Sequence, residues 1–178
     1  WISTTKGISM IIVNYHDKSD IVSLNVKNYD QLDGLQAGEF NENAAYKTSR
    51  GELIFGGAKG FNIFSPAAIS TNEMAPAVVL MNFQVFNKNV NAGDISGNRM
   101  ILDKAIAETK EITLSHSDNV IALEFAALNF TNTEKNKYAY ILEGFDKSWS
   151  ATDAKIRKAT YTNLDPGNYT FRVKATNE

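Results

Sequence analysis

The chain has 178 residues, of which 43% are hydrophobic and 21% charged, and its formal net charge at pH 7 is -2. This is the composition of an ordinary globular chain that can bury one core or two small ones. The balanced charge argues against nucleic-acid binding, the absence of cysteine excludes disulfides and thiolate zinc sites, and no apolar run approaches the roughly 18 residues needed to cross a bilayer.

A short internal repeat marks the beginning of the chain. Residues 1–8 (WISTTKGI) align with residues 54–61 (IFGGAKGF) at an offset of 53 positions. Each copy predicts a hairpin in which an apolar strand, a turn ending in Lys-Gly and a second apolar strand follow one another. The glycine suits a backbone with positive φ. A period near 50 residues with several short strands is typical of β-propeller blades, although two copies cannot close a propeller.

The segments around these hairpins alternate between strands and loops. Residues 21–26 alternate as a half-buried strand does, residues 30–39 are polar and contain glycine as loops do, and residues 40–47 return to a strand. A polar segment that ends in a proline, residues 71–76, is predicted to be a linker. We therefore expect one unit over residues 1–70 and a second over residues 77–178.

The second unit is predicted to be a run of strands. The period-2 pattern places Val79, Met81, Phe83 and Val85 on one face of the first strand, and Ile121, Leu123 and Phe125 on one face of a later strand with Glu124 opposite. In the last strand, Tyr169, Phe171, Val173 and Ala175 alternate with polar residues, which is typical of a β-sandwich. Residues 94–110 are compatible with a loop or with a short helix over residues 104–110.

A corner precedes that last strand. Pro166 and Gly167 suit the two central positions of a type II turn, and Tyr169 stands where its hydroxyl can bond back to the backbone. This tyrosine-corner device is used by immunoglobulin-like and fibronectin type III sandwiches. Trp149 is expected to supply the large aromatic side chain of such a core.

No motif predicts catalysis or a metal or cofactor site. Ser115, His116 and Asp118 have the residue types of a hydrolase triad, but adjacent residues do not converge as a triad requires. The glycine-rich residues 56–60 lack the Gly-Lys-Ser/Thr order of a phosphate loop, and a hairpin turn is the simpler interpretation. Asp30 and Asp33 lack the further oxygen ligands of a calcium loop.

Two sets of residues resemble a known family. Residues 138–146 (YAYILEGFD), Trp149, residues 159–164 (ATYTNL) and residues 166–175 (PGNYTFRVKA) resemble the Y_Y_Y domain, which closes the sensor region of hybrid two-component systems common in Bacteroidetes. Its three namesake tyrosines correspond best to Tyr140, Tyr161 and Tyr169. Residues 33–35 (DGL), 39–41 (EFN), 51–57 (GELIFGG), 60–61 (GF) and 64–66 (FSP) resemble blades of the two-component regulator propeller.

The resemblance implies an all-β chain in which terminal β-propeller blade strands precede an immunoglobulin-like or fibronectin type III-like β-sandwich that stops before its last strand. It also implies a periplasmic part of an inner-membrane protein, which relays oligosaccharide binding in the propellers to a membrane helix and a histidine kinase. Dimerisation through the sandwich is expected, and membrane attachment would come only from a helix outside this chain. Tyr140, Trp149, Tyr161, Pro166, Gly167 and Tyr169 are expected to be structural, with the ligand-binding residues unidentified and no cofactor.

A different class of function stays open on the sequence. The chain could be a carbohydrate-binding or adhesive module of a secreted protein, because Trp and Tyr stack on flat apolar faces. Exposed aromatic residues would favour this alternative. A β-sandwich hydrolase would instead require acidic residues that converge in a polar cleft.

Overall fold

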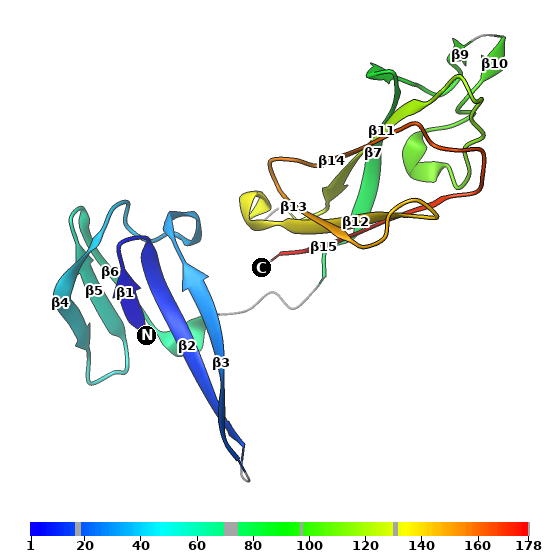
Figure 1. Ribbon diagram of the computed structural model, residues 1–178. Helices are drawn as coiled ribbons and strands as arrows, with labels where there is room; N and C mark the ends of the chain where they lie inside the picture. The colour runs from blue at the N-terminus through cyan, green and yellow to red at the C-terminus, as the bar shows by residue number, and fades with distance from the viewer. Residues whose placement is uncertain (17–18, 70–74, 97, 130–131, 178) are drawn as a thin grey trace. The chain divides into compact units, whose positions relative to one another are not determined.

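The computed structural model describes residues 1–16, 19–69, 75–96, 98–129 and 132–177. They form antiparallel strands and single-turn 3-10 helices, so the expected all-β fold is confirmed (Figure 1). The chain divides into unit 1, residues 1–71, and unit 2, residues 72–178. Most of the predicted linker, residues 71–74, lies outside the described residues. Within the described residues, no helix has the length and apolar character required to cross a membrane.

Unit 1 consists of two three-stranded antiparallel sheets. The first has the order β1-β2-β3, formed by Ile2–Thr4, Gly7–His16 and Ser19–Tyr29, and the second has the order β4-β5-β6, formed by Phe40–Lys47, Leu53–Gly57 and Gly60–Phe64. The 3-10 turn η1 (Gln31–Asp33) lies between the sheets in sequence and η2 (Pro66–Ala68) follows β6. The sheets share a core of Ile8, Phe40 and Phe55, with Trp1, Leu35, Leu53 and Phe64 packed around it.

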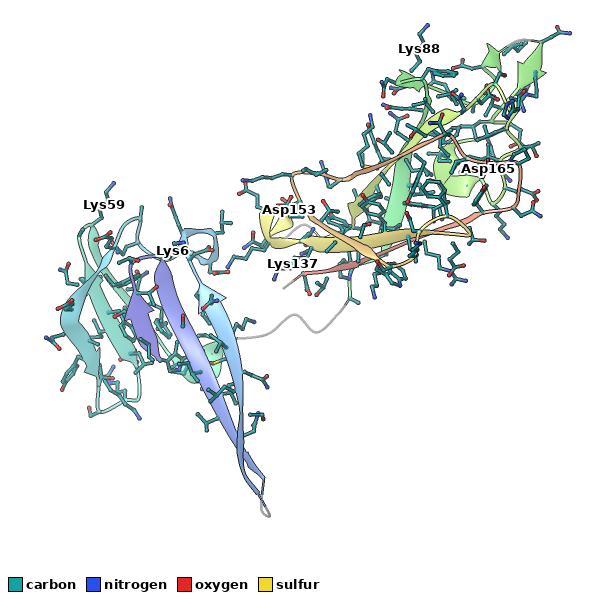
Figure 2. The ribbon with its side chains drawn as sticks, in the orientation of Figure 1. Lys6, Lys59, Lys88, Lys137, Asp153 and Asp165 are labelled. Carbon is teal, nitrogen blue, oxygen red and sulfur yellow. The ribbon has the colours of Figure 1, made fainter. Side chains whose placement is uncertain are left out.

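The sequence repeat corresponds to two hairpins with the same turn. Thr4 pairs with Gly7 in the first and Gly57 pairs with Gly60 in the second, so both turns contain two residues. Gly7 has a φ of 144° and Gly60 a φ of 128°, as predicted from the Lys-Gly signature. A Cβ atom on Gly7 would lie 2.0 Å from the Tyr29 carbonyl oxygen, so the first turn admits only glycine. Figure 2 labels the two turn lysines, Lys6 and Lys59.

Unit 2 is a sandwich of two antiparallel sheets. The four-stranded sheet has the order β14-β11-β7-β8 and the three-stranded sheet the order β13-β12-β15. The strands are β7 (Val78–Val85), β8 (Lys88–Asn89), β11 (Val120–Ala127), β12 (Lys137–Glu143), β13 (Ser150–Asp153), β14 (Lys158–Thr162) and β15 (Thr170–Thr176), with a small ribbon of β9 (Ile95–Ser96) and β10 (Arg99–Met100) and the 3-10 turns η3 (Ile106–Glu108) and η4 (Thr133–Lys135).

The inward-facing side chains of the two sheets form one core. Phe83 and Phe125 are its largest fully buried side chains, and Leu102 is the next largest. The predicted inward face of β11, Ile121, Leu123 and Phe125, is confirmed, as is the inward face of β15. Residues 101–106 close one part of this core with Ile101, Leu102 and Ile106, and residues 106–108 form a single 3-10 turn.

The predicted face of β7 is wrong in its first half. The pairing of β7 with β11 shifts between Leu80 and Asn82, so Met81 is an extra residue in a β-bulge. The bulge reverses the inside-outside alternation before it. Val78, Leu80, Phe83 and Val85 therefore pack on the core, whereas Met81 is 61% exposed.

Candidate functional site

The motif tyrosine Tyr161 is tied to the turn that follows β12. Its hydroxyl donates a hydrogen bond to Asp146 Oδ2 over 3.0 Å, and the same oxygen accepts a bond of 2.7 Å from the Leu142 backbone N–H. The Asp146 N–H in turn donates to the Leu142 carbonyl. Tyr161 lies on β14 of one sheet and Leu142 on β12 of the other, so Asp146 connects the two sheets.

The surroundings of Tyr161 favour its neutral form. Burial raises the pKa of its hydroxyl well above the ordinary value, and the hydrogen bond to Asp146 and the negative charge of that carboxylate raise it further. Phe145 packs edge-on against the Tyr161 ring with centroids 5.7 Å apart. Tyr161 is therefore a fixed hydrogen-bond donor at neutral pH and serves to hold the turn.

Tyr140 belongs to the aromatic core. Its ring centroid lies 5.7 Å from that of Phe125 and 6.2 Å from that of Phe171. The rings of Phe171 and Tyr161 are nearly perpendicular, with centroids 6.4 Å apart. The cluster joins β11, β12, β14 and β15, so it locks both sheets together.

Tyr169 forms the predicted tyrosine corner. Its hydroxyl donates to the Asp165 carbonyl over 2.8 Å. Its ring lies against Gly144, which has a φ of 96°, and a Cβ atom at that position would lie 3.0 Å from Tyr169 Cδ1. Gly144 is therefore required both by its backbone conformation and by this close approach.

The predicted type II turn at Pro166 and Gly167 is wrong. The second central residue of such a turn needs a positive φ, and Gly167 is not among the glycines with positive φ. The residues form a bend instead, and the bond from the Tyr169 hydroxyl to Asp165 fixes the corner.

Trp149 does not lie in the core, contrary to the expectation from sequence. It is 42% exposed and immediately precedes the edge strand β13. The ammonium group of Lys174 stands 4.4 Å from the centroid of its ring, on the outward side of β15. Beside it, Arg172 Nε contacts Glu143 Oε1 at 2.7 Å. Trp149 is thus a surface residue held by a cation–π contact.

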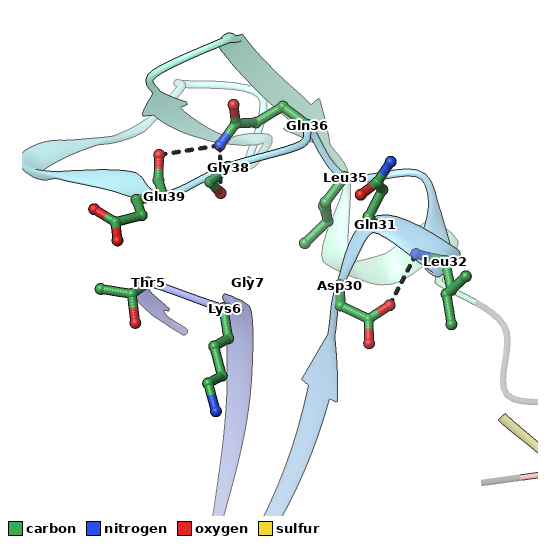
Figure 3. Close-up of a pocket in the computed structure, with 10 residues that line it drawn as sticks. All are labelled: Thr5, Lys6, Gly7, Asp30, Gln31, Leu32, Leu35, Gln36, Gly38 and Glu39. Carbon is green, nitrogen blue, oxygen red and sulfur yellow. Dashed lines mark hydrogen bonds between the residues drawn. The ribbon is translucent and has the colours of Figure 1, made fainter. Parts of the chain in front are cut away.

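Unit 1 contains an open pocket of about 260 Å³ between the β1–β2 turn and residues 30–39 (Figure 3). Much of its polar lining serves the fold. Gln36 Nε2 donates to the carbonyls of Gly38 and Glu39, its Oε1 accepts from Lys59 N–H, and Asp30 caps η1 by accepting from Leu32 N–H. Lys6 also lines the pocket. This lining stabilises the connection between the two sheets.

The triad-like residue types near position 116 do not converge. Asp118 Oδ2 accepts from Ser115 N–H at 2.8 Å and forms a short ion pair with Arg99, so it closes a turn. The glycine-rich residues 56–60 form the β5–β6 turn, as predicted. Within the described part of the chain, no group of three or more His, Cys, Asp or Glu side chains could hold a metal ion.

Sequence reasoning missed the roles of Asp146 and Lys174. Asp146 follows Gly144 within a turn, and this pairing of a glycine and a side-chain acceptor was the available signal. Lys174 was recognised only as an outward residue of β15. Its contact with Trp149 depends on where β13 begins, which the sequence pattern does not reveal.

Residues 129–178 match the model of the Y_Y_Y domain. They include the three motif tyrosines and β12 to β15, which confirms the resemblance drawn from the sequence.

This chain is 37% identical to histidine kinase P4 of Formosa agariphila over 180 aligned residues, which cover 99% of the chain. The chain spans only 12% of the length of that protein. The fold is similar to the crystal structure of the extracellular domain of a protein described as a hybrid two-component system, BT3049 of B. thetaiotaomicron, with a TM-score of 0.72 and 24% identity. That alignment covers 97% of this chain and 22% of the solved one.

Proposed function

We propose that the chain is the signal-relaying part of the extracytoplasmic sensor of a hybrid two-component histidine kinase. The observation that carries this proposal is the order of the two units. A pair of stacked sheets with uncovered apolar outer faces comes first, and a Y_Y_Y sandwich follows.

The outer faces of unit 1 support its assignment to propeller blades. In the first sheet the face away from the shared core contains Ile2, Val13, Leu24 and Val26, which are 41–59% exposed. In the second sheet the outer face contains Tyr46, Phe61 and Ile63, which are 50–68% exposed. Blades in a propeller are covered on both faces by their neighbours. Both sheets therefore have the surfaces of blades that stack between others.

Unit 2 is suited to transmit a change of position without changing its own fold. Its sheets are joined by the aromatic cluster of Tyr140, Phe125 and Phe171 and by the bond from Tyr161 to Asp146. In the proposed mechanism, oligosaccharide binding by the propellers of the whole protein changes how two sandwiches are arranged in a dimer. The ligand acts through its different affinities for the two arrangements. A membrane helix beyond this chain passes the change to the kinase, so the chain itself is not catalytic.

A thermal-shift screen with a panel of oligosaccharides tests where the ligand binds. The screen is run in parallel on this chain and on the complete sensor region of the same protein. The proposal predicts a shift of the melting temperature only for the complete region. A shift of equal size for this chain alone would contradict the relay function, because the ligand would then bind within these 178 residues.

The exposure of Trp149 favours a second candidate function, a carbohydrate-binding module. An exposed ring beside charged side chains can stack on a sugar ring. In that case this chain would respond in the screen and Trp149→Ala would abolish the response. Under the relay function, Trp149→Ala leaves the response of the complete region unchanged.

A further inference from the structure

The pocket of unit 1 is formed by three internal segments of the chain. Residues 36–39 form one wall, the β1–β2 turn with Thr5 and Lys6 forms another, and the η1 turn forms a third (Figure 3). Every lining residue falls between positions 5 and 39, so neither end of the chain borders the pocket. Its volume of about 260 Å³ lies just below the roughly 300–1,000 Å³ typical of ligand pockets, which suits one small ring.

The backbone around the pocket is fixed by hydrogen bonds that leave other lining groups free. The Gln36 side chain holds the carbonyls of residues 38 and 39, and the Asp30 carboxylate caps η1. Four polar side chains of the lining form no hydrogen bond or ion pair within the described part of the chain: Thr5, Lys6, Gln31 and Glu39. These groups stand on a preorganised frame, so little ordering is needed when they bind a ligand.

The chemistry of the lining favours an uncharged ligand that is rich in hydroxyl groups. The four side chains supply a carboxylate acceptor, an ammonium donor, an amide and a hydroxyl, all of which bond well to hydroxyl groups. Leu32 also lines the pocket and is 49% exposed, so it offers an apolar surface to the C–H face of a ring. The carboxylates of Asp30 and Glu39 outnumber the ammonium group of Lys6, so an anionic ligand would be repelled.

We propose that this pocket holds one uncharged sugar residue of the oligosaccharide that the complete sensor binds, an assignment that rests on the relay function proposed above. Sugar hydroxyls bond to Glu39 and Gln31, and the ring packs against Leu32. One sugar in an open pocket binds weakly, because few contacts offset the freedom that the ligand loses. The other sugars are held elsewhere in the complete sensor region, so binding is measured on that region.

Calorimetric titration of the complete sensor region tests the pocket with Glu39→Gln and a matched control, Glu42→Gln. The probes are neutral oligosaccharides of glucose, galactose, mannose and xylose, beside an oligogalacturonide as the anionic probe. Glu39→Gln should weaken the binding of a neutral probe at least tenfold, because an amide replaces a charged acceptor. Glu42 is exposed on β4 and does not line the pocket, so Glu42→Gln should bind as the wild type does.

Gln31→Ala gives a second test at another wall of the pocket, and it should also weaken binding. Wild-type affinity in both Glu39→Gln and Gln31→Ala would overturn the proposed pocket, as would an equal loss in Glu42→Gln. Tighter binding of the oligogalacturonide than of every neutral probe would overturn it too. Each of these results leaves the relay function standing. If none of the probes binds to the complete sensor region, the relay function and the pocket fail together.

Discussion

The hydroxyl of Tyr161 donates to Asp146 Oδ2 at 3.0 Å, and through that carboxylate β14 of one sheet is connected to β12 of the other. Tyr161→Phe removes this hydrogen bond and keeps the ring. We expect a loss of about 1–2 kcal/mol in the free energy of unfolding, because the acceptor is charged and partly buried. Urea denaturation measures this loss. A change below about 0.3 kcal/mol would contradict the connecting role.

The same hydroxyl makes stability depend on alkaline pH. Burial and Asp146 raise the pKa of Tyr161 in the folded chain above its unfolded value of about 10. The stabilisation is present below pH 10 and is lost as the pH rises further, because the unfolded chain releases its proton first. Denaturation at pH 8 and at pH 10.5 should show a larger loss for the wild type than for Tyr161→Phe. Equal losses would show that Tyr161 is not the group responsible.

Two glycines near Tyr169 should respond oppositely to alanine. Gly144→Ala imposes a side chain at a φ of 96° and places it 3.0 Å from the Tyr169 ring. We expect a loss of about 1–3 kcal/mol. Gly167→Ala meets the ring at an ordinary 3.7 Å, and its φ is outside the left-handed region. It should be neutral or stabilising by up to about 1 kcal/mol. Thermal denaturation measures the change in stability of both variants. Equal losses would contradict the bend at residues 166–167, because Gly167 would then require glycine as Gly144 does.

The bulge in β7 predicts different tolerances at neighbouring positions. Met81 is 61% exposed, so Met81→Ser should change stability by no more than about 0.5 kcal/mol. Leu80 packs on the core opposite Phe125, and Leu80→Ser should cost about 1–3 kcal/mol. Urea denaturation measures both losses. A larger loss for Met81→Ser than for Leu80→Ser would contradict the bulge, because Met81 would then face the core as the uninterrupted alternation of the sequence predicts.

The features predicted correctly from sequence depend on strictly local chemistry. Gly7 and Gly60 are recognisable because a positive φ after a turn favours glycine, and β15 because alternation persists over its whole length. Tyr169 and its corner are likewise encoded within a few residues.

Two of the features that were missed depend on partners distant in sequence. The extra residue at Met81 appears only through pairing with β11, and period-2 patterns cannot show which strand position is doubled. The strand-and-corner pattern of a sandwich predicts Trp149 in the core. Its outward position follows from the edge strand β13 and from Lys174, 25 positions later in the chain.

The proposed change in the arrangement of two sandwiches on oligosaccharide binding can be tested by a distance measurement. A spin label at the exposed Lys155 in the complete sensor kinase reports the separation of the two copies by pulsed electron resonance. The measurement is made with and without the oligosaccharide that shifts the melting temperature of the complete sensor region. The relay function predicts a change in the distance distribution between the two states. The same distance distribution with and without saturating oligosaccharide would contradict this function. The absence of any measurable distance between two labels would contradict it too, because the protein would then not be a dimer.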